Sequence, residues 1–185
     1  MELLIRCLTG LRSRYNQWIL HSRGVAIEGK CWFQDVAVPR NPWDIQIGAG
    51  VMLDEKVTLL STGEKREAPR IILHSGTYIN RYTMLDATEK IELGEKCLIG
   101  PFCYITDHDH DLEKGAGHFV SRPVIIRDGC WIGAHVTVLK GVEIGENSIV
   151  GAGSVVTRSL PPGCVAAGNP ARVIKQRTFS SEDLK

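Results

Sequence analysis

The residues best suited to chemistry stand in one polar stretch, residues 107–123, which reads DHDHDLEKGAGHFVSRP. It holds three histidines, His108, His110 and His118, and the first two alternate with aspartates. Imidazole titrates near neutral pH, so it can take a proton from a reacting hydroxyl. Neutral imidazoles are also common zinc ligands. The stretch therefore indicates acid–base catalysis, a metal site or a merely solvated polar loop, and the elements around it decide how these side chains are positioned.

The rest of the chain follows a six-residue period. Aliphatic β-branched residues recur without a break at Ile126, Ile132, Val138, Ile144, Val150 and Val156. A compact residue stands four positions after five of them, at Cys130, Val136, Val142, Ser148 and Ser154. A period of six fits neither an α-helix nor simple strand alternation. It is typical of a hexapeptide β-solenoid, in which three hexads form one triangular coil and the anchors build a continuous apolar core.

Glycine directly follows several anchors, where we expect tight corners that need a positive φ, at Gly133, Gly145 and Gly151. The six-residue period begins irregularly at Ile27 and is broken at Pro39–Pro42. We expect a loop to interrupt it again at 61–69. Residues 107–123 are its largest interruption. Long loops in economical folds are usually functional, which makes this insertion the candidate site.

Length and composition describe one ordinary globular domain. The 185 residues suffice for a core, and the net charge of +1 gives no global attraction to nucleic acid or to a membrane surface. The six cysteines form no CxxC pair, and we interpret them as small core residues in a reducing compartment rather than as disulfides or metal ligands. Without a signal peptide or a spanning apolar run, we expect a cytoplasmic protein.

Residues 1–22 depart from the six-residue period. Apolar residues recur there at helical spacing, with arginines between them, at Leu3, Leu4, Leu8, Leu11, Tyr15, Trp18 and Ile19. We predict a short amphipathic helix. Such a helix either caps the open end of the solenoid or packs on a neighbour, or it makes peripheral contact with a membrane near a lipid-linked acceptor.

The predicted organisation is therefore an all-β solenoid with an extruded loop and short terminal helices. Residues 1–22 form the N-terminal helix or cap, 23–160 the β-helix with its loop at 107–123, and 161–185 a C-terminal segment and tail. Within that tail, residues 178–184 either add one helical turn or fray.

Four runs give the chain a resemblance to the hexapeptide-repeat acyltransferases, above all the maltose and galactoside O-acetyltransferases. They are Thr106-Asp107-His108, Cys130-Trp131-Ile132-Gly133, residues 149–158 and residues 167–174. The resemblance implies a left-handed parallel β-helix, an exception to right-handed crossovers. It also implies a homotrimer with active sites between subunits, using acetyl-CoA and no metal. Two departures, Asp109 in place of the usual proline and the short N-terminal segment, look more like the relatives that decorate surface polysaccharides.

Carried over position by position, the resemblance assigns His108 as the catalytic base. Asn80 and Trp131 match acceptor-binding positions, and His110, the local competitor of His108, is assigned to substrate binding. The residues matching coenzyme-binding positions are Ala134, Ala152, Thr157, Arg158, Arg172 and Lys175. Small side chains suit a groove for the pantetheine arm, and cationic side chains suit the phosphorylated head. The competing readings are an ordinary corner for Asn80, loop packing for Trp131 and solvated surface charges for the basic residues.

The function predicted from the sequence is an acetyl-CoA-dependent O-acetyltransferase in polysaccharide biosynthesis, acting on a sugar or polysaccharide-precursor hydroxyl. His108 takes the hydroxyl proton, and the hydroxyl attacks the thioester directly because no cysteine lies in the loop to act as nucleophile. Backbone N–H groups hold the developing oxyanion.

Three other readings stay open. The first is N-acetylation of an amino sugar, or acetylation of an antibiotic, by the same base and groove. The second is a solenoid-type zinc carbonic anhydrase, for which histidines are available at His74, His108, His110, His118 and His135. Against this, Glu113 stands where the second histidine of that family's spaced pair belongs. The third is a purely structural solenoid, which would have no use for the extruded histidine loop.

Overall fold

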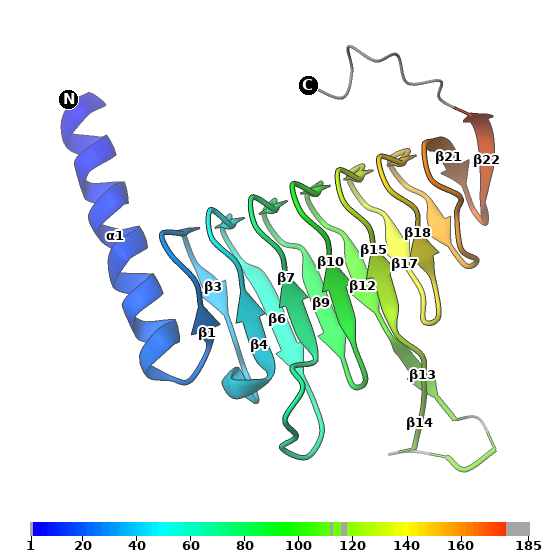
Figure 1. Cartoon of the computed structure of the whole chain (residues 1–185), viewed down its shortest axis with the longest axis horizontal. Coiled ribbons are helices and arrows are strands. Elements are labelled where there is room, and N and C mark those ends of the chain that lie inside the picture. The colour runs from blue at the N-terminus through cyan, green and yellow to red at the C-terminus, as the bar shows by residue number, and fades with distance from the viewer. Residues whose placement is uncertain (1, 112, 116–117, 177–185) are drawn as a thin grey trace.

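The computed structural model describes residues 2–111, 113–115 and 118–176, and these form a three-sided parallel β-helix with one helix at its N-terminal end (Figure 1). Each coil contributes one short strand to each of three sheets. This arrangement confirms the predicted left-handed β-helix of hexapeptide repeats. The chain runs A, B, C around each coil before it rises to the next.

We name the three sheets by their order around the coil. Sheet A contains β1 (Ala26–Ile27), β4 (Ile45–Ile47), β7 (Ile71–Leu73), β10 (Ile91–Leu93), β15 (Val124–Ile126) and β18 (Glu143–Ile144). Sheet B contains β2 (Trp32–Phe33), β5 (Met52–Leu53), β8 (Tyr78–Ile79), β11 (Leu98–Ile99), β16 (Trp131–Ile132), β19 (Ile149–Val150), β21 (Cys164–Gly168) and β22 (Ala171–Gln176). Sheet C contains β3 (Val36–Ala37), β6 (Val57–Ser61), β9 (Met84–Ala87), β12 (Tyr104–Thr106), β17 (Thr137–Val138) and β20 (Val155–Val156).

The strand register explains the six-residue period. Three hexads make one coil, so equivalent anchors lie 18 residues apart and pair directly, as Ile126 with Ile144, Ile132 with Val150 and Val138 with Val156. All six anchors from Ile126 to Val156 are at most 1% exposed. Each contributes about 1.5–3 kcal/mol by leaving water. The compact residues four positions later are buried as well, which confirms that both hexad positions point inward.

The glycines after the anchors have a different role from the expected one. Gly133, Gly145 and Gly151 do not adopt a positive φ. A Cβ on Gly133 would instead lie 2.7 Å from the backbone nitrogen of Ala152, and one on Gly145 would lie 2.3 Å from that of Pro162. Glycine is therefore required there because the next coil approaches closely. The positive-φ corners belong to other positions, including Gly153 and His135.

Helix α1 (Glu2–Ser22) packs across the first coil (Figure 1). Leu20 is buried in the core, and the hydroxyl of Ser13 accepts a hydrogen bond from the Phe33 N–H at 2.9 Å. At the next irregularity, the break in the hexads at Pro39–Pro42, the 3-10 helix η1 (Pro42–Asp44) interrupts the coil. Within the described part of the chain, no helix combines the length and the hydropathy needed to cross a bilayer.

The C-terminal end of the solenoid is closed by a β-hairpin. Beyond residue 160, the predicted end of the β-helix, β21 pairs in parallel with β19 and then turns back into the antiparallel β22. The helical turn considered for residues 178–184 lies outside the described residues. The thiols of Cys97, Cys103, Cys130 and Cys164 are free and buried, so these cysteines serve as the small core residues predicted.

Substitution of Gly145 tests whether glycine is required there because the next coil lies close or because the backbone needs a positive φ. In Gly145→Ala the new Cβ meets backbone atoms of Pro162, so a coil must shift, and we expect a destabilisation of about 1–3 kcal/mol. The matched control is Gly10→Ala in α1, where nothing lies within 4 Å of the added Cβ. That change should stabilise the protein by up to about 1 kcal/mol. Urea unfolding midpoints measure both effects, and an unchanged midpoint for Gly145→Ala would contradict the packing explanation.

Candidate active site

A groove of about 530 Å³ lies on the outer face of sheet B. Its floor consists of the residues that precede the buried anchors and therefore point outward, in the row Tyr78, Leu98, Trp131 and Ile149. The parallel register stacks each of these side chains on the next, from coil to coil. The result is a continuous apolar strip, open to solvent and aligned with the long axis of the solenoid.

Four of the predicted binding residues line this groove: Asn80, Trp131, Ala134 and Ala152. The Trp131 side chain is 54% exposed on the floor, so it presents its ring to a ligand. The Oδ1 atom of Asn80 accepts a hydrogen bond from the Arg81 N–H at 2.8 Å, which orients the amide. The left-handed corner position belongs to Tyr82, at φ 58°, so Asn80 is not there for its backbone conformation.

Ala134 and Ala152 occupy the same corner on successive coils. The Gly153 N–H donates a hydrogen bond to the Ala134 carbonyl at 2.8 Å, which fixes the two corners together. Their methyl groups leave the groove open along its side. The groove thus has the straight course, apolar floor and small side chains that a pantetheine arm requires.

The insertion at 107–123 is a β-hairpin rather than an irregular loop. Strand β13 (His108–His110) pairs antiparallel with β14 (Phe119–Ser121), with His108 opposite Ser121. The His108 ring meets the Phe119 ring edge-on, with centroids 4.9 Å apart. The hairpin therefore holds this imidazole at its base, next to the solenoid.

Asp107 anchors the hairpin. Its carboxylate is fully buried and accepts hydrogen bonds from three consecutive backbone N–H groups, those of Thr88, Glu89 and Lys90, at 2.6–3.1 Å. The Thr88 hydroxyl donates a further bond at 3.1 Å. Such charge-assisted bonds compensate the desolvation of the carboxylate. The corner of one coil thereby fixes the first residue of the hairpin on the next.

The same carboxylate orients the catalytic candidate. His108 Nδ1 lies 3.1 Å from Asp107 Oδ1 and 3.3 Å from the Thr106 hydroxyl, and its side chain is only 12% exposed. Because a carboxylate only accepts, the network places a proton on Nδ1. Nε2 then carries the lone pair, which is the state a general base needs.

His110 lies in different surroundings from His108. It is exposed, its ring is tilted against Phe119 at 5.1 Å, and it lines a separate hollow of about 650 Å³. Asp109 and Lys140 form an ion pair beside it. The structure therefore does not bring His110 into the groove with Asn80 and Trp131.

Within one protomer, His108 is also separated from the groove. The hairpin leaves the solenoid between β12 of sheet C and β15 of sheet A, at the corner opposite sheet B. Figure 1 shows β13 and β14 projecting from the side opposite to β21 and β22. The chain therefore carries the candidate base on one side and the groove on another.

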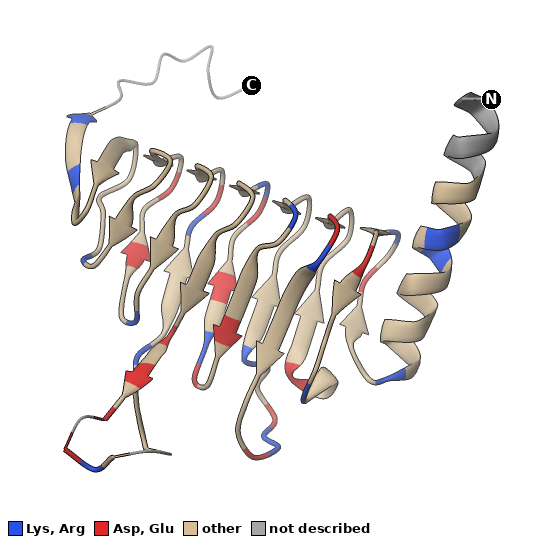
Figure 2. Cartoon of the chain, turned by 180° about the vertical axis from the view of Figure 1, so that it is seen from behind, with Lys and Arg blue, Asp and Glu red and all other residues tan. Residues whose placement is uncertain are grey.

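The four polar residues predicted to bind the coenzyme also lie on two different sides of the solenoid. Arg172 and Lys175 lie on β22, the edge strand of sheet B beyond the groove, where Figure 2 shows blue segments. Thr157 and Arg158 instead follow β20 of sheet C, at the corner that carries the hairpin two coils earlier. All four side chains are exposed. Asp86 lies on sheet C and accepts a hydrogen bond from the Tyr104 hydroxyl at 3.0 Å.

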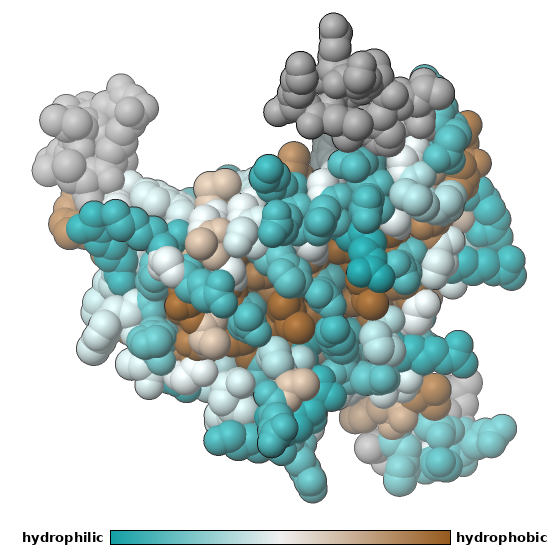
Figure 3. All heavy atoms as spheres, in the orientation of Figure 1, coloured by the Kyte–Doolittle hydropathy of each residue, from teal (hydrophilic) through white to brown (hydrophobic). Residues whose placement is uncertain are grey.

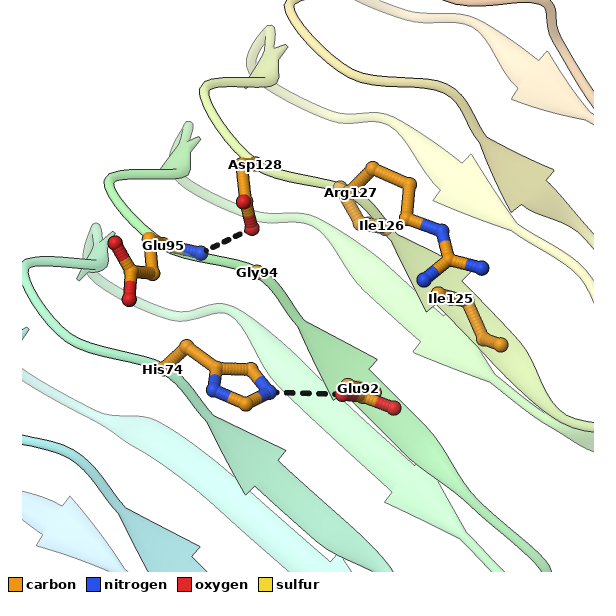
Figure 4. Close-up of a pocket in the computed structure, with 8 residues that line it drawn as sticks. All are labelled: His74, Glu92, Gly94, Glu95, Ile125, Ile126, Arg127 and Asp128. Atoms are coloured by element: carbon orange, nitrogen blue, oxygen red, sulfur yellow. Dashed lines mark hydrogen bonds and ion pairs between the residues drawn. The ribbon is translucent and has the colours of Figure 1, made fainter.

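A further hollow of about 220 Å³ lies on sheet A, but most of its polar side chains already have partners (Figure 4). His74 Nε2 lies 2.8 Å from Glu92, and Asp128 accepts the Glu95 N–H at 2.8 Å. Arg127 pairs with Glu143 at 2.7 Å. Figure 3 shows this side of the solenoid, where brown side chains run along the middle and teal ones interrupt them. The hollow offers no base comparable to His108.

The described side chains include neither a cluster of metal ligands nor an accessible reactive thiol. His74 lies on sheet A, His108 at the corner between C and A, and His135 stacks on Phe102 at the corner between B and C. Among the described residues, no three His, Cys, Asp or Glu side chains are placed to share a metal ion. The hydrogen bond to Cys130 and burial raise the pKa of Cys97, and burial raises the pKa of Cys103, so these two are poor nucleophiles. The hydrogen bond with Cys97 lowers the pKa of Cys130, but that thiol is fully buried in the core and out of reach of a substrate.

Comparison with known proteins confirms the resemblance to the hexapeptide-repeat acyltransferases. Residues 123–158 match the family described as bacterial transferase hexapeptide (six repeats). The galactoside O-acetyltransferase of Escherichia coli is 44% identical over 90 residues, 46% of this chain and 44% of that protein. A probable acetyltransferase of Mycobacterium tuberculosis is 34% identical over 145 residues, 75% of this chain and 46% of that protein. The chain thus spans about half the length of the curated relatives it matches.

Solved structures match over most of their length. A variant of the N-acyltransferase AntD from Bacillus cereus, in complex with dTDP-4-amino-4,6-dideoxyglucose and coenzyme A, superposes with a TM-score of 0.77. It is 27% identical, and the match covers 91% of this chain and 92% of that one. A hexapeptide-repeat acetyltransferase of Vibrio cholerae in complex with acetyl-CoA, 24% identical with a TM-score of 0.65, covers 90% and 79%. At that identity it shows the fold alone.

The sequence interpretation missed the apolar floor of the groove. Tyr78, Leu98 and Ile149 are functional candidates that only the three-dimensional stacking brings together. The signal was present in the hexad, because each of them directly precedes a buried anchor of sheet B. The anchoring by Thr88–Lys90 had no such signal, since backbone N–H groups perform it.

Asp107→Asn should disturb His108 without touching its ring. An asparagine amide would turn a donor toward backbone donors, so we expect a destabilisation of about 1–3 kcal/mol and a loss of the fixed Nδ1–H tautomer. Nitrogen-15 NMR of the histidine rings reports the tautomer, and thermal unfolding reports the stability. Asp109→Asn, the same change on an exposed residue two positions away, is the control. Equal His108 spectra in wild type and Asp107→Asn would refute the orienting role.

Proposed function

Since sequence and fold both carry the resemblance to the hexapeptide-repeat acyltransferases, we propose that the protein is an acetyl-CoA-dependent O-acetyltransferase acting on a sugar or polysaccharide-precursor hydroxyl. The observation that carries the proposal is the division of the site. Sheet B holds Asn80, Trp131, Ala134 and Ala152 beside the groove, whereas the corner between sheets C and A holds His108. The two halves fit together only between neighbouring protomers.

The proposed assembly is a homotrimer in which the hairpin of one protomer faces the groove of the next. In a cyclic arrangement the same two surfaces meet at every boundary, so three identical sites result. The corner that carries His108 also carries Thr157 and Arg158, and sheet B also carries Arg172 and Lys175. Cations from both protomers would thus gather near the C-terminal end of each groove, where the phosphorylated head of the coenzyme would bind.

The proposed chemistry uses one base. Acetyl-CoA supplies the activated acetyl thioester, which Ala134 and Ala152 admit by leaving the corner open. His108 Nε2 accepts the acceptor's hydroxyl proton as that oxygen bonds to the acetyl carbon, and it returns the proton to the departing sulfur. Asp107 stabilises the imidazolium formed in between, since its carboxylate already holds Nδ1. Asn80 and Trp131 hold the acceptor against the floor, where ring stacking suits a sugar face.

A second candidate is N-acylation of an amino sugar. It is favoured by the structural similarity to AntD, whose complex contains an amino-sugar nucleotide. The same base and groove serve both reactions. Paired acceptors that differ only in a hydroxyl or an amino group, tested for coenzyme A release, distinguish the two.

His108→Ala should remove the base and leave the coenzyme groove intact. We expect kcat to fall by roughly 10²–10⁴, as is usual for loss of a general base, with KM for acetyl-CoA little changed. Coenzyme A release with a panel of saccharides measures both parameters. The control is His118→Ala, an exposed histidine of the same hairpin. A His108→Ala protein as fast as wild type would remove this residue from the mechanism.

Mixing two inactive variants tests the division between protomers. Ala152→Trp fills the groove, and His108→Ala removes the base, so either homotrimer should be inactive. In randomly mixed trimers, about a quarter of the boundaries combine an intact groove with an intact His108, so about a quarter of wild-type activity should return. No recovery after co-expression, with mixed trimers present, would mean that the base serves a groove of its own protomer.

A further inference from the structure

Helix α1 packs on the solenoid mainly through polar side chains, next to the buried Leu20 near its C-terminal end. Ser13 is 2% exposed and bonds to the backbone of Phe33. The Gln17 amide donates to the Gly29 carbonyl at 2.9 Å and accepts from the Cys31 N–H at 3.2 Å, and Asn16 donates to the Gln34 carbonyl. These bonds satisfy backbone groups at the open end of the first coil. They also fix the rotation of the helix about its own axis.

The opposite face of α1 is apolar and exposed. Leu8, Leu11, Tyr15 and Trp18 are 56%, 62%, 60% and 65% exposed. Their spacing of three, four and three residues places them in one row along the helix. We call these four residues the outer stripe. A surface helix ordinarily turns its apolar stripe toward the core, whereas these four side chains face solvent.

Positive charge borders the outer stripe. Arg12 and Arg14 are exposed, and the 3.6-residue helical period places them on opposite sides of the row that contains Leu11. Residues 8–22 contain no Asp or Glu, and Figure 2 shows blue but no red on the coloured part of α1. Long cationic side chains can lie along apolar surface and direct their charge to its edge.

From this pattern we propose that α1 docks the protein onto an anionic lipid surface. Apolar and aromatic side chains enter the interface between headgroups and acyl chains, while the two arginines meet the lipid phosphates. Trp and Tyr suit this depth, since their rings are amphipathic. A second copy of α1 fits less well, because its own Arg12 and Arg14 would face like charges.

The position of the helix suits a flat partner. In Figure 1, α1 lies across one end of the solenoid, and no other labelled element extends beyond it there. The outer stripe therefore faces away from the coils. In the homotrimer of the proposed function, three such helices would lie at the same end, and three weak contacts would act together on one membrane.

The docking is tested with the full-length protein and vesicles. Flotation compares vesicles of phosphatidylcholine alone with vesicles that contain an equal share of phosphatidylserine. We expect wild type to float with the anionic vesicles, and Leu11→Glu/Trp18→Glu to lose at least tenfold in partition. Arg12→Gln/Arg14→Gln should lose roughly tenfold on anionic vesicles and little on neutral ones.

The control is Trp43→Ser, which removes another exposed tryptophan outside the outer stripe and should float like wild type. Thermal unfolding checks that each variant folds, and Trp18→Ser alone replaces the double variant if that one does not. The inference is overturned if wild type floats no better than the outer-stripe variant. It is equally overturned if wild type ignores vesicles and forms a larger assembly that the variant abolishes. Acetyl transfer to a soluble saccharide, measured on the same proteins, reports separately on the proposed function.

Discussion

The structure depends on the direct pairing of each coil with the next. Parallel register sets Ile132 on Val150 and Val138 on Val156, so the core is a set of continuous columns rather than a packed centre. The same register aligns the outward residues. Trp131 lies between Leu98 and Ile149 because their neighbouring anchors pair. The groove is thus a consequence of the core, and a shift of register would abolish both.

A three-sided coil also decides how a site is built. Each hexad forms one of the three sides of the coil. Side chains that point outward from different sides therefore face different directions, and within one protomer they do not line the same site. The base leaves from one corner, and the groove lies on the sheet opposite to it. In the homotrimer proposed above, these two surfaces are complementary half-sites that meet between protomers. This gives the apolar floor of sheet B and the extruded hairpin a common explanation.

The sequence alone predicted the structure correctly where a residue type has only one structural role. The β-branched period predicted the coil, and the alanines one coil apart predicted the wall of the groove. The sequence alone did not predict the role of a residue where that role depends on its neighbours in space. Gly145 was expected to supply a positive φ, yet it is small because Pro162 lies against it. His110 shares its residue type with His108 and its neighbourhood in sequence, but it lies two residues farther along β13, beside the separate hollow that Lys140 lines.

Asp107 resolves a conflict inherent in an extruded catalytic loop. A base must be held rigidly, whereas residues that project from a repeat fold have few packing partners. The carboxylate is buried in the solenoid and held by the backbone of Thr88–Lys90, one coil away, and the next residue in the chain is His108. The imidazole therefore takes its position from the coil as well as from its edge-on contact with Phe119 of the hairpin.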